Sequence, residues 1–399
     1  MKKISSERMV IMQTGLPLRI LMGPGPSDVH PRVLQALSYP VIGHLDPEFL
    51  LLMNDTMDML RKLFATDNQV TVPMSGTGSS GMETIFVNLL EPGDKVIIGV
   101  NGLFGQRMVD VAERVGAQPI VVEAPWGEPI DPEAIESAAK NSGRIKAIAV
   151  VHAETSTGVR QPLEPISSIA KQFEALFLVD AVTSLGGIPV NIEQIGVDAC
   201  YSGTQKCLSV PPGLSPLSIS SKAEKILNAR KDKVRSWYLD LTMITKYWGS
   251  ERFYHHTAPI SMIFALREGL RMILEEGPEK VYARHRLNGE ALQAGLTNMG
   301  LKLLVNHEYR LPMLTSVVIP ENVADMEVRK RLLDLYGIEI GGGLGVLKGK
   351  IWRVGLMGHA SRRKNVLLFL SALEDTLRQL DYPVPPGAGV EGALQVYNN

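Results

Sequence analysis

The chain is poor in cysteine, lacks long apolar runs and carries almost no net charge. Its two cysteines, Cys200 and Cys207, are too few for a disulfide framework or a zinc site with four cysteine ligands, and we interpret both as packing residues. No apolar run approaches the ~18 residues of a membrane span, and we find no secretion or lipidation signal. Lys and Arg number 41 against 42 for Asp and Glu. We therefore expect a cytoplasmic protein without a metal and without a nucleic-acid or membrane partner.

What is present is the composition of a folded α/β protein. Apolar residues make up 45% of the 399 residues, a length that predicts two or three domains at about 150 residues each. Between residues 70 and 202, short β-rich runs alternate with helical stretches. The runs at 145–152 and 176–180 do not alternate apolar with polar residues, which is typical of parallel strands covered on both faces. The sequence therefore predicts a large, mostly parallel sheet sandwiched by helices.

A shift in composition at Gly277-Pro278 marks the start of a second, smaller α+β domain. In this domain we expect strands at 314–319 and 351–355 and helices at 279–299, 325–336 and 364–380, the last of them ending the fold.

A glycine-rich loop, SGTGSSG at residues 75–81, lies between a predicted strand and a predicted helix. Its three glycines match the G-x-G-x-x-G pattern of dinucleotide-binding sites. That pattern also requires an acidic residue at the end of the next strand. Here Asp94 precedes the strand at 95–100 and Asn101 follows it, so a nicotinamide cofactor is the weaker interpretation.

The same loop is suited to bind an anion. Glycines allow a ligand to approach the backbone closely, the following helix offers free N–H groups, and Thr77, Ser79 and Ser80 add hydroxyls. The sequence therefore predicts a phosphate site at the start of this helix. An ordinary serine-capped turn between a strand and a helix would have the same pattern.

Two chemically active residues follow strands of the predicted sheet. Asp180 ends the run at 176–180, and Lys206 follows the predicted strand at 199–202. At the carboxyl edge of a parallel sheet such side chains face the ligand crevice, although each alone also suits a helix cap or a surface lysine. A phosphate cup, a fixed carboxylate and one presented lysine together match pyridoxal phosphate chemistry. The lysine holds the aldehyde as a Schiff base, and the carboxylate keeps the pyridine nitrogen protonated.

With these residues in place, the sequence resembles the fold-type I, class V aminotransferases, and within them the alanine–glyoxylate / serine–pyruvate group. The resemblance runs from about Leu21 to Leu380. The matching stretches are GPGPSDVHPRVL (23–34), SGTGSSG (75–81), NGLFGQR (101–107), ETSTGV (154–159), LVDAVTSLGG (178–187), YSGTQKCL (201–208), YHHT (254–257) and GGGLG…WRVGLMG (341–358).

The resemblance implies an architecture, a cofactor and an activity. It implies an N-terminal arm (1–20), a large cofactor domain (21–276) and a small C-terminal domain (277–399). The implied cofactor is pyridoxal 5'-phosphate, and the implied assembly is a homodimer with active sites shared between subunits. The implied reaction moves the amino group of L-alanine or L-serine to glyoxylate or pyruvate, so the partners would be small amino and keto acids.

The resemblance also assigns roles to single residues. Lys206 would bind the cofactor and carry the substrate proton, and Asp180 would pair with the pyridine nitrogen. Arg353 would clamp the substrate carboxylate beneath the loop of Gly25. The remaining cofactor contacts would be ring stacking by Phe104, a hydrogen bond to the ring oxygen from Thr155, a wall beside the ring at Ser79, phosphate binding by Thr77, Gly78 and Gln205, and phosphate binding across the dimer by Tyr254 and Thr257.

Three positions depart from the pattern of the animal enzymes in this group. Phe104 stands where a tryptophan is common, Thr155 where a serine is common, and Ser79 where a histidine can lie beside the ring. The third departure leaves the amino donor open. Ureidoglycine–glyoxylate transamination is therefore a second hypothesis, although Tyr254 stands where an asparagine is expected in those enzymes. The sequence is also compatible with a β-elimination lyase that uses the same cofactor, or with an NAD-dependent oxidoreductase.

Overall fold

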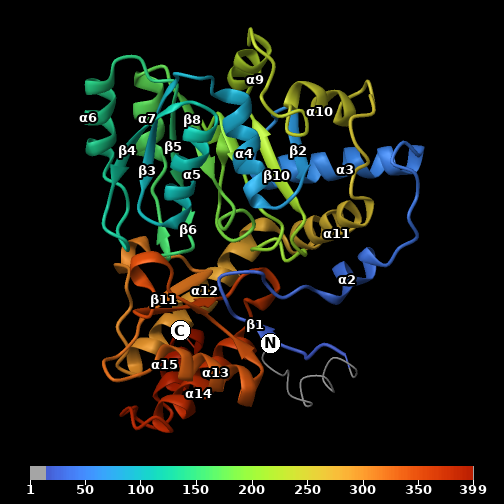
Figure 1. Cartoon of the computed structure of the whole chain (residues 1–399). Helices are drawn as coiled ribbons and strands as arrows, with labels where there is room; N and C mark the ends of the chain where they lie inside the picture. The colour runs from blue at the N-terminus through green and yellow to red at the C-terminus, as the bar shows by residue number, and fades with distance from the viewer. Residues whose placement is uncertain (1–14, 399) are drawn as a thin grey trace, which may run out of the picture.

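The computed structural model describes residues 15–398, so most of the predicted N-terminal arm, residues 1–20, lies outside the described residues. Its central sheet consists of the strands β2 (Val70–Ser75), β3 (Lys95–Val100), β4 (Gln118–Glu123), β5 (Ala147–Val151), β8 (Leu176–Asp180), β9 (Ala199–Tyr201) and β10 (Leu214–Ile219). Their spatial order is β2-β10-β9-β8-β5-β3-β4. Strand β10 is antiparallel to both neighbours and the remaining pairs are parallel. The predicted α/β fold with a mostly parallel sheet is confirmed (Figure 1).

Helices surround this sheet (Figure 1). They are α2 (Pro31–Leu37), α3 (Pro47–Phe64), α4 (Gly78–Leu89), α5 (Leu103–Arg114), α6 (Pro132–Ser142), α7 (Glu164–Gln172), α8 (Ile192–Ile195), α9 (Ser221–Asn228), α10 (Leu241–Trp248) and α11 (Ile260–Glu276). Several begin where the sequence supplies a cap. In α3, for example, Asp46 accepts a hydrogen bond from the Glu48 backbone and Pro47 takes the first helical position, where its missing N–H costs nothing.

The C-terminal part of the chain forms a second group of helices and strands, seen in orange and red in Figure 1. Its elements are α12 (Pro278–Asn298), β11 (Leu314–Val318), α13 (Asp325–Tyr336), β12 (Ile338–Glu339), β13 (Gly341–Gly342), β14 (Ile351–Gly355), α14 (Arg363–Arg378) and α15 (Ala388–Asn398). An antiparallel sheet has the order β11-β14-β13. The first described strand, β1 (Ile20–Leu21), pairs with β12, and Met22 joins the C-terminal hydrophobic cluster.

The expectation that a helix at 364–380 ends the fold was wrong, because α15 follows it and packs against α12 and α14. Glycines interrupt the apolar pattern of this last segment and lower its helix propensity. The same glycines allow close packing. A Cβ on Gly392 would lie 2.9 Å from the carbonyl oxygen of Ala294 in α12, and one on Gly389 would lie 2.8 Å from the Met299 sulfur. Tertiary contact therefore outweighs the poor local propensity.

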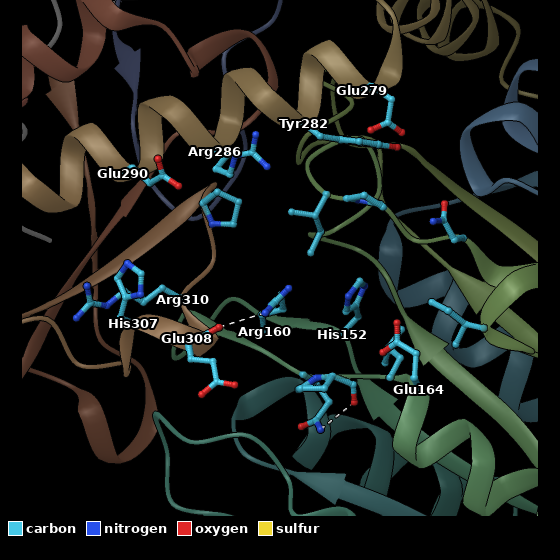
Figure 2. A pocket seen from close by; sticks show the side chains of 18 of the residues that line it. His152, Arg160, Glu164, Glu279, Tyr282, Arg286, Glu290, His307, Glu308 and Arg310 are labelled. Carbon is cyan, nitrogen blue, oxygen red and sulfur yellow. Dashed lines mark hydrogen bonds between the residues drawn. The ribbon is translucent and has the colours of Figure 1, made fainter. Parts of the chain in front are cut away.

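A cavity of about 720 Å³ lies between α12 and the segment around β7 (Val159–Arg160) and α7 (Figure 2). Charged side chains, among them Arg160, Arg286 and Glu290, surround it (Figure 2). His152 follows β5 and forms part of the wall, and burial lowers the pKa of its imidazole to about 4, which leaves the ring neutral at pH 7. The residues with predicted chemical roles do not line this cavity.

Candidate active site

The predicted catalytic residues lie at the carboxyl edge of the central sheet. Asp180 is the last residue of β8, and Lys206 lies in the loop that joins β9 to β10. Each is more than nine-tenths buried, and each charge affects the pKa of the other. The structure thus brings the two residues into one electrostatic environment, as the strand pattern predicts.

The Asp180 carboxylate is fixed by two hydrogen bonds. Its Oδ1 accepts from the Val182 backbone at 2.8 Å, and its Oδ2 accepts from the Tyr201 hydroxyl at 2.8 Å. Burial raises the pKa of Asp180 to about 6, and the two hydrogen bonds limit that rise because they favour the charged form. The carboxylate is therefore oriented and still ionised at neutral pH.

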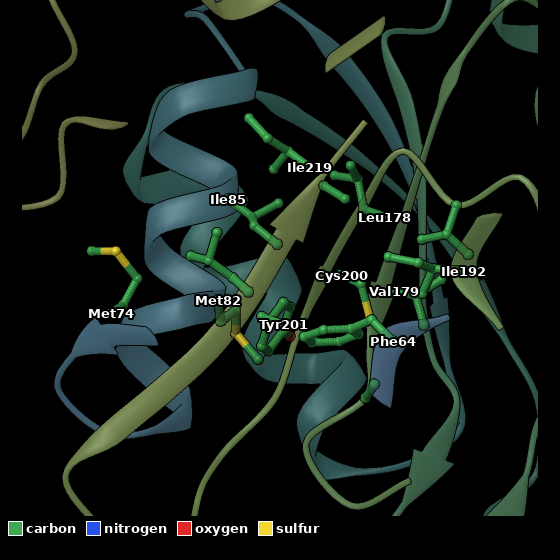
Figure 3. Packing of buried hydrophobic residues seen from close by; sticks show 14 of the residues in the cluster. Phe64, Met74, Met82, Ile85, Leu178, Val179, Ile192, Cys200, Tyr201 and Ile219 are labelled. Atoms are coloured by element: carbon green, nitrogen blue, oxygen red, sulfur yellow. The ribbon is translucent and has the colours of Figure 1, made fainter. Parts of the chain in front are cut away.

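The sequence pattern did not identify Tyr201 as a functional residue. Its ring is fully buried on β9 beside Cys200, in the apolar packing between α4 and the sheet (Figure 3). Only the hydroxyl is polar, and it points to Asp180. Two features could have indicated its role. Tyr201 ends a strand that is next to the strand of Asp180, and it belongs to the YSGTQKCL stretch.

The Lys206 amine lies against the backbone of the GPGP segment. Its Nζ donates to the Pro24 carbonyl, and a Cβ placed on Gly25 would lie 2.7 Å from Nζ. Gly25 also has φ +115°, a conformation that favours glycine, so this position cannot hold a larger residue without moving the lysine. Burial, followed by the nearby charge of Arg353, lowers the pKa of Lys206 to about 8.

The lowered pKa of Lys206 predicts how cofactor loading depends on pH. With a pKa of about 8, about one tenth of the amine is neutral at pH 7, against less than about one in a thousand for an ordinary lysine. Loading of the stripped protein with pyridoxal phosphate, followed by visible absorbance, should accelerate roughly tenfold from pH 7 to pH 9 and then level off. A rate that keeps rising in proportion to hydroxide up to pH 10, as it does for Nα-acetyl-lysine, would contradict the lowered pKa.

Arg353 on β14 connects the C-terminal layer to the site. Its Nη1 donates to the Thr155 carbonyl at 3.0 Å, and its Nε donates to the Gly342 carbonyl at 2.8 Å. The guanidinium is buried, which lowers its pKa to about 10, and no carboxylate of residues 15–398 lies within 4.0 Å of it. A buried cation without a protein counterion is costly, and a substrate carboxylate would supply the missing charge.

Glu154 is a second residue that the sequence pattern did not reveal. It is fully buried and accepts hydrogen bonds from the Ser156 backbone (3.0 Å), the Ser156 hydroxyl (2.6 Å) and the Phe104 backbone (3.1 Å). Its carboxylate thereby caps the start of α5 and fixes the position of Phe104. Burial raises the pKa of Glu154, opposed by these hydrogen bonds. Its only signal in the sequence was its place in the ETSTGV stretch.

The start of α4 has the free donors that the glycine-rich loop predicts. Thr77 occupies the N-cap position but makes no side-chain capping bond. The amide oxygen of Gln205 is buried without a hydrogen-bond partner in the described chain, and a Cβ on the intervening Gly203 would lie 2.9 Å from this oxygen and 3.5 Å from the Gly78 Cα. The free backbone N–H groups at this helix start and the uncommitted Thr77 hydroxyl fit the phosphate of the implied cofactor. Gln205 would bind it through its amide NH2, because an amide oxygen only accepts hydrogen bonds.

Arg107 contacts both Ser79 and Phe104. Arg107 lies over the Phe104 ring, 4.9 Å from its centroid, and its Nη1 donates to the Ser79 hydroxyl at 3.4 Å. The structure therefore brings together the predicted ring-stacking residue and the position that departs from the family pattern.

Tyr254 and Thr257 are the two predicted site residues that do not join this cluster. Their hydroxyls lie 3.4 Å apart on the surface, and Tyr254 is 52% exposed. Within residues 15–398 neither forms a hydrogen bond to Lys206, Asp180 or Gln205. Their predicted role at the phosphate requires a neighbouring subunit and stays a prediction.

Two properties of the described residues, 15–398, concern helices that could cross a membrane and groups of metal ligands. None of the helices there is both long enough and apolar enough to cross a membrane. In the same range, no three or more His, Cys, Asp and Glu side chains are grouped in a way that could bind a metal ion.

The fold and the site together define a class of enzyme. A buried lysine with a lowered pKa, an oriented carboxylate and an uncapped helix start at the edge of this sheet are the parts of a fold-type I pyridoxal-phosphate enzyme. When bound, this cofactor acts as an electron sink for bonds at the substrate α-carbon. Lys206 would supply the amine, Asp180 the counter-charge and the start of α4 the phosphate donors.

The comparisons with known proteins identify the family. The model of the family "Aminotransferase class-V" matches residues 25–363, and the chain belongs to this family. A (S)-ureidoglycine–glyoxylate transaminase of Bacillus subtilis is 41% identical over 96% of each chain, and an alanine–glyoxylate aminotransferase of Oryctolagus cuniculus is 40% identical over 91% of this chain and 93% of its own. The protein is thus an aminotransferase that uses pyridoxal phosphate.

Solved structures agree with this assignment. The ureidoglycine–glyoxylate aminotransferase of Bacillus subtilis aligns with TM-score 0.94 at 42% identity, covering 96% of this chain and 99% of that one. An alanine–glyoxylate aminotransferase of Nostoc sp. aligns with TM-score 0.90 at 48% identity, covering 95% and 100%. The fold-type I architecture implied by the motifs is confirmed.

Proposed function

We propose that this enzyme transfers the amino group of L-alanine or L-serine to glyoxylate, with pyruvate as the acceptor in the serine reaction. The observation that carries the proposal is the buried Arg353, which has no carboxylate partner within residues 15–398 and lies close enough to Lys206 to lower its pKa. A small α-keto or α-amino acid bound there would place its α-carbon between the arginine and the lysine. The relatives named above, whose acceptor is glyoxylate, support the same substrate class.

The residues divide the work between binding and proton transfer. Arg353 orients the substrate through its carboxylate, while Lys206 takes the proton from the α-carbon and returns it. Asp180 would pair its negative charge with the cofactor's pyridine nitrogen, and Glu154 keeps Phe104 in place through α5. The Gly25 backbone excludes water beside the Lys206 amine.

Replacing Arg353 with glutamine should weaken substrate binding more than it slows the chemistry. Loss of a charge-assisted, two-point contact is expected to raise KM for glyoxylate roughly 100-fold, with kcat lowered less than about tenfold. Steady-state kinetics with varied glyoxylate test this. Arg310→Gln is the matched control, because Arg310 is part-buried and, within residues 15–398, its side chain donates only to the Val305 carbonyl. An unchanged KM in the Arg353 variant would remove the arginine from its role.

A second candidate donor is ureidoglycine, with the same acceptor. The similarity to the Bacillus subtilis enzyme, in both sequence and structure, favours it. The Ser79–Arg107 pair beside Phe104 also favours it, because a hydroxyl and a guanidinium there offer hydrogen bonds to a polar amino donor.

A panel of amino donors with glyoxylate as acceptor separates the two candidates. The proposal predicts the highest kcat/KM for alanine or serine, with glycine as the shared product. A kcat/KM for ureidoglycine at least about tenfold above both would establish the second candidate instead, since that ratio corresponds to a clear difference in transition-state binding. Activity with none of these donors would refute both.

We also propose that the enzyme is a homodimer whose subunits share active sites. Exposed apolar side chains occur on and near α2, α3, α10 and the loop before α11, namely Leu34, Tyr39, Val41, Leu45, Leu51, Trp237, Tyr238, Phe253 and Tyr254. Apolar groups in this number suggest a surface covered by another copy of the chain, and they include Tyr254. Sedimentation velocity of the holoenzyme checks this, and a monomer at micromolar concentration would contradict it.

A further inference from the structure

A second, smaller cavity of about 230 Å³ lies next to the loop that carries Lys206. Its lining includes Cys207 and Ser209 from that loop, His30 at the start of α2, and His359 and Arg362 from the turn before α14. None of these residues has a role in the reaction proposed above. The lining also includes Arg284 and Glu276, so it holds four side chains with nitrogen donors and one carboxylate.

The hydrogen bonding of His30 fixes which ring nitrogen carries the proton. His30 is the N-cap of α2, and its Nδ1 accepts from the Arg32 backbone at 3.1 Å. Because Nδ1 acts as the acceptor, the neutral ring carries its hydrogen on Nε2. This Nε2–H has no hydrogen-bond partner within residues 15–398, so one donor at the cavity is unused.

Arg362 is the second group with unused donors. Its Nη2 lies 2.5 and 2.9 Å from the two ring nitrogens of His359, and the His359 ring meets that of His30 edge-on with centroids 4.7 Å apart. The remaining N–H groups of Arg362 make no hydrogen bond in the described chain, and no carboxylate there lies within 4.0 Å of the guanidinium. A guanidinium and two imidazoles thus converge on one small space, whose one lining carboxylate within residues 15–398, Glu276, is paired with Arg284.

The neighbouring charges do not neutralise Arg362. Arg284 lines the same cavity, but its guanidinium donates to the Glu276 carboxylate in two contacts of 2.6 and 3.0 Å. The charges of Arg284 and Glu276 therefore compensate each other. Burial raises the pKa of Asp28. The nearby charges of Arg362 and Lys364 partly oppose that rise. The Asp28 carboxylate, however, accepts from the Leu21 backbone and forms no ion pair with Arg362.

The cationic groups around this cavity also affect the imidazole of His359. Burial, together with the charges of Arg362, His30, Arg284 and Lys364, lowers the pKa of its imidazole to about 4. The nearby carboxylates are those of Glu276, which is paired with Arg284, of Asp28, which is bonded to the Leu21 backbone, and of Glu268, which is paired with Arg32. A negatively charged ligand would relieve this repulsion, whereas a neutral or cationic one would not.

The cavity wall is directly linked to the catalytic loop. Ser209 has φ +52°, an uncommon conformation for a non-glycine residue, and its hydroxyl accepts from the His359 backbone at 2.8 Å. The Ser27 hydroxyl, 3.4 Å from that of Ser209, donates to the Lys206 carbonyl at 2.7 Å. A ligand here would bridge the loop after Lys206 and the turn before α14.

We propose that this cavity is a binding site for a small oxyanion, held by the guanidinium of Arg362 and the Nε2–H of His30. A planar guanidinium binds phosphate or carboxylate oxygens with two parallel bonds, and an imidazole N–H adds a third. The volume accommodates a phosphate ion or a short carboxylate and leaves no room for a nucleotide or a peptide. The site is separate from Arg353, which does not line this cavity.

Calorimetric titration of the holoenzyme with inorganic phosphate, and separately with acetate, tests the proposal. The bound cofactor occupies the phosphate cup during the titration. The test variants are Arg362→Gln and His30→Asn, because asparagine preserves the N-cap of α2 while removing the imidazole donor. Arg363→Gln is the matched control, since Arg363 adjoins Arg362 but lies over the Tyr397 ring.

The proposal predicts one anion per subunit, with affinity lowered about tenfold or more in both test variants and unchanged in Arg363→Gln. Binding of phosphate alone identifies a free inorganic oxyanion as the ligand, and binding of acetate as well identifies a carboxylate. Acetate that binds equally well to Arg362→Gln has bound at Arg353 and counts against the site. Absence of anion binding, or equal affinity in wild type and both test variants, overturns the proposal. Equal thermal midpoints without anion verify that the variants are folded.

Discussion

Replacing Lys206 with alanine should lower the rate of transamination by roughly 10⁴-fold or more, because in the proposed mechanism the same amine would both hold the cofactor and carry the substrate proton. The structure gives this amine no substitute: Lys206 is buried, its pKa is lowered to about 8, and the Gly25 backbone closes over it. Steady-state assays with alanine and glyoxylate measure the loss.

Lys222→Ala is the matched control for this variant. Lys222 lies in α9, directly after strand β10 of the central sheet, and donates to the Ala175 carbonyl and the Asp198 carboxylate. It shares no hydrogen-bond partner with Lys206. Its activity should stay within about twofold of wild type, as for a surface ion pair. If the Lys206 variant retains near wild-type activity, the assignment of the catalytic lysine fails.

Replacing Asp180 with asparagine should lower kcat by roughly 10²- to 10³-fold while leaving the fold intact, because a neutral amide cannot hold the pyridine nitrogen in its protonated form. The substitution is nearly isosteric, and the amide oxygen still accepts from the Val182 backbone. Cofactor affinity, measured by dialysis and absorbance, should fall as well, which a merely structural role would not require.

Tyr201→Phe is a milder change at the same carboxylate, to be compared with Asp180→Asn. It keeps the Asp180 charge and removes one of its two hydrogen bonds, so the pKa of Asp180 should rise above its value of about 6. Activity should then fall by at most about tenfold at pH 8 and more steeply towards pH 6, where the carboxylate becomes protonated. If Asp180→Asn lost no more activity than Tyr201→Phe, the charge would not be what the site requires.

The sequence predicted those parts of the molecule that depend on local pattern. Continuous apolar runs identified the buried parallel strands, because strands covered on both faces do not need polar residues. The same strands placed Asp180 and Lys206 at one edge. The NAD-dependent hypothesis fails because the chain belongs to the class-V aminotransferases.

The parts that the sequence did not reveal depend on contacts between distant segments. Glu154 lies 50 residues from the helix start that it caps, and Tyr201 lies 21 residues from the carboxylate that it orients. Neither has a motif of its own, since a buried glutamate or tyrosine acquires its role only from its partner. The helix α15 was missed for a related reason, because its glycines are unfavourable alone and favourable only against α12.

Borohydride reduction of the purified holoenzyme, followed by mass mapping of its peptides, tests the central claim most directly. Reduction fixes the cofactor permanently to the amine that holds it. The account predicts a single pyridoxyl group, located on Lys206, and loss of the yellow colour. A pyridoxyl group on another lysine, or a protein that stays colourless and unmodified after incubation with pyridoxal phosphate, would contradict it.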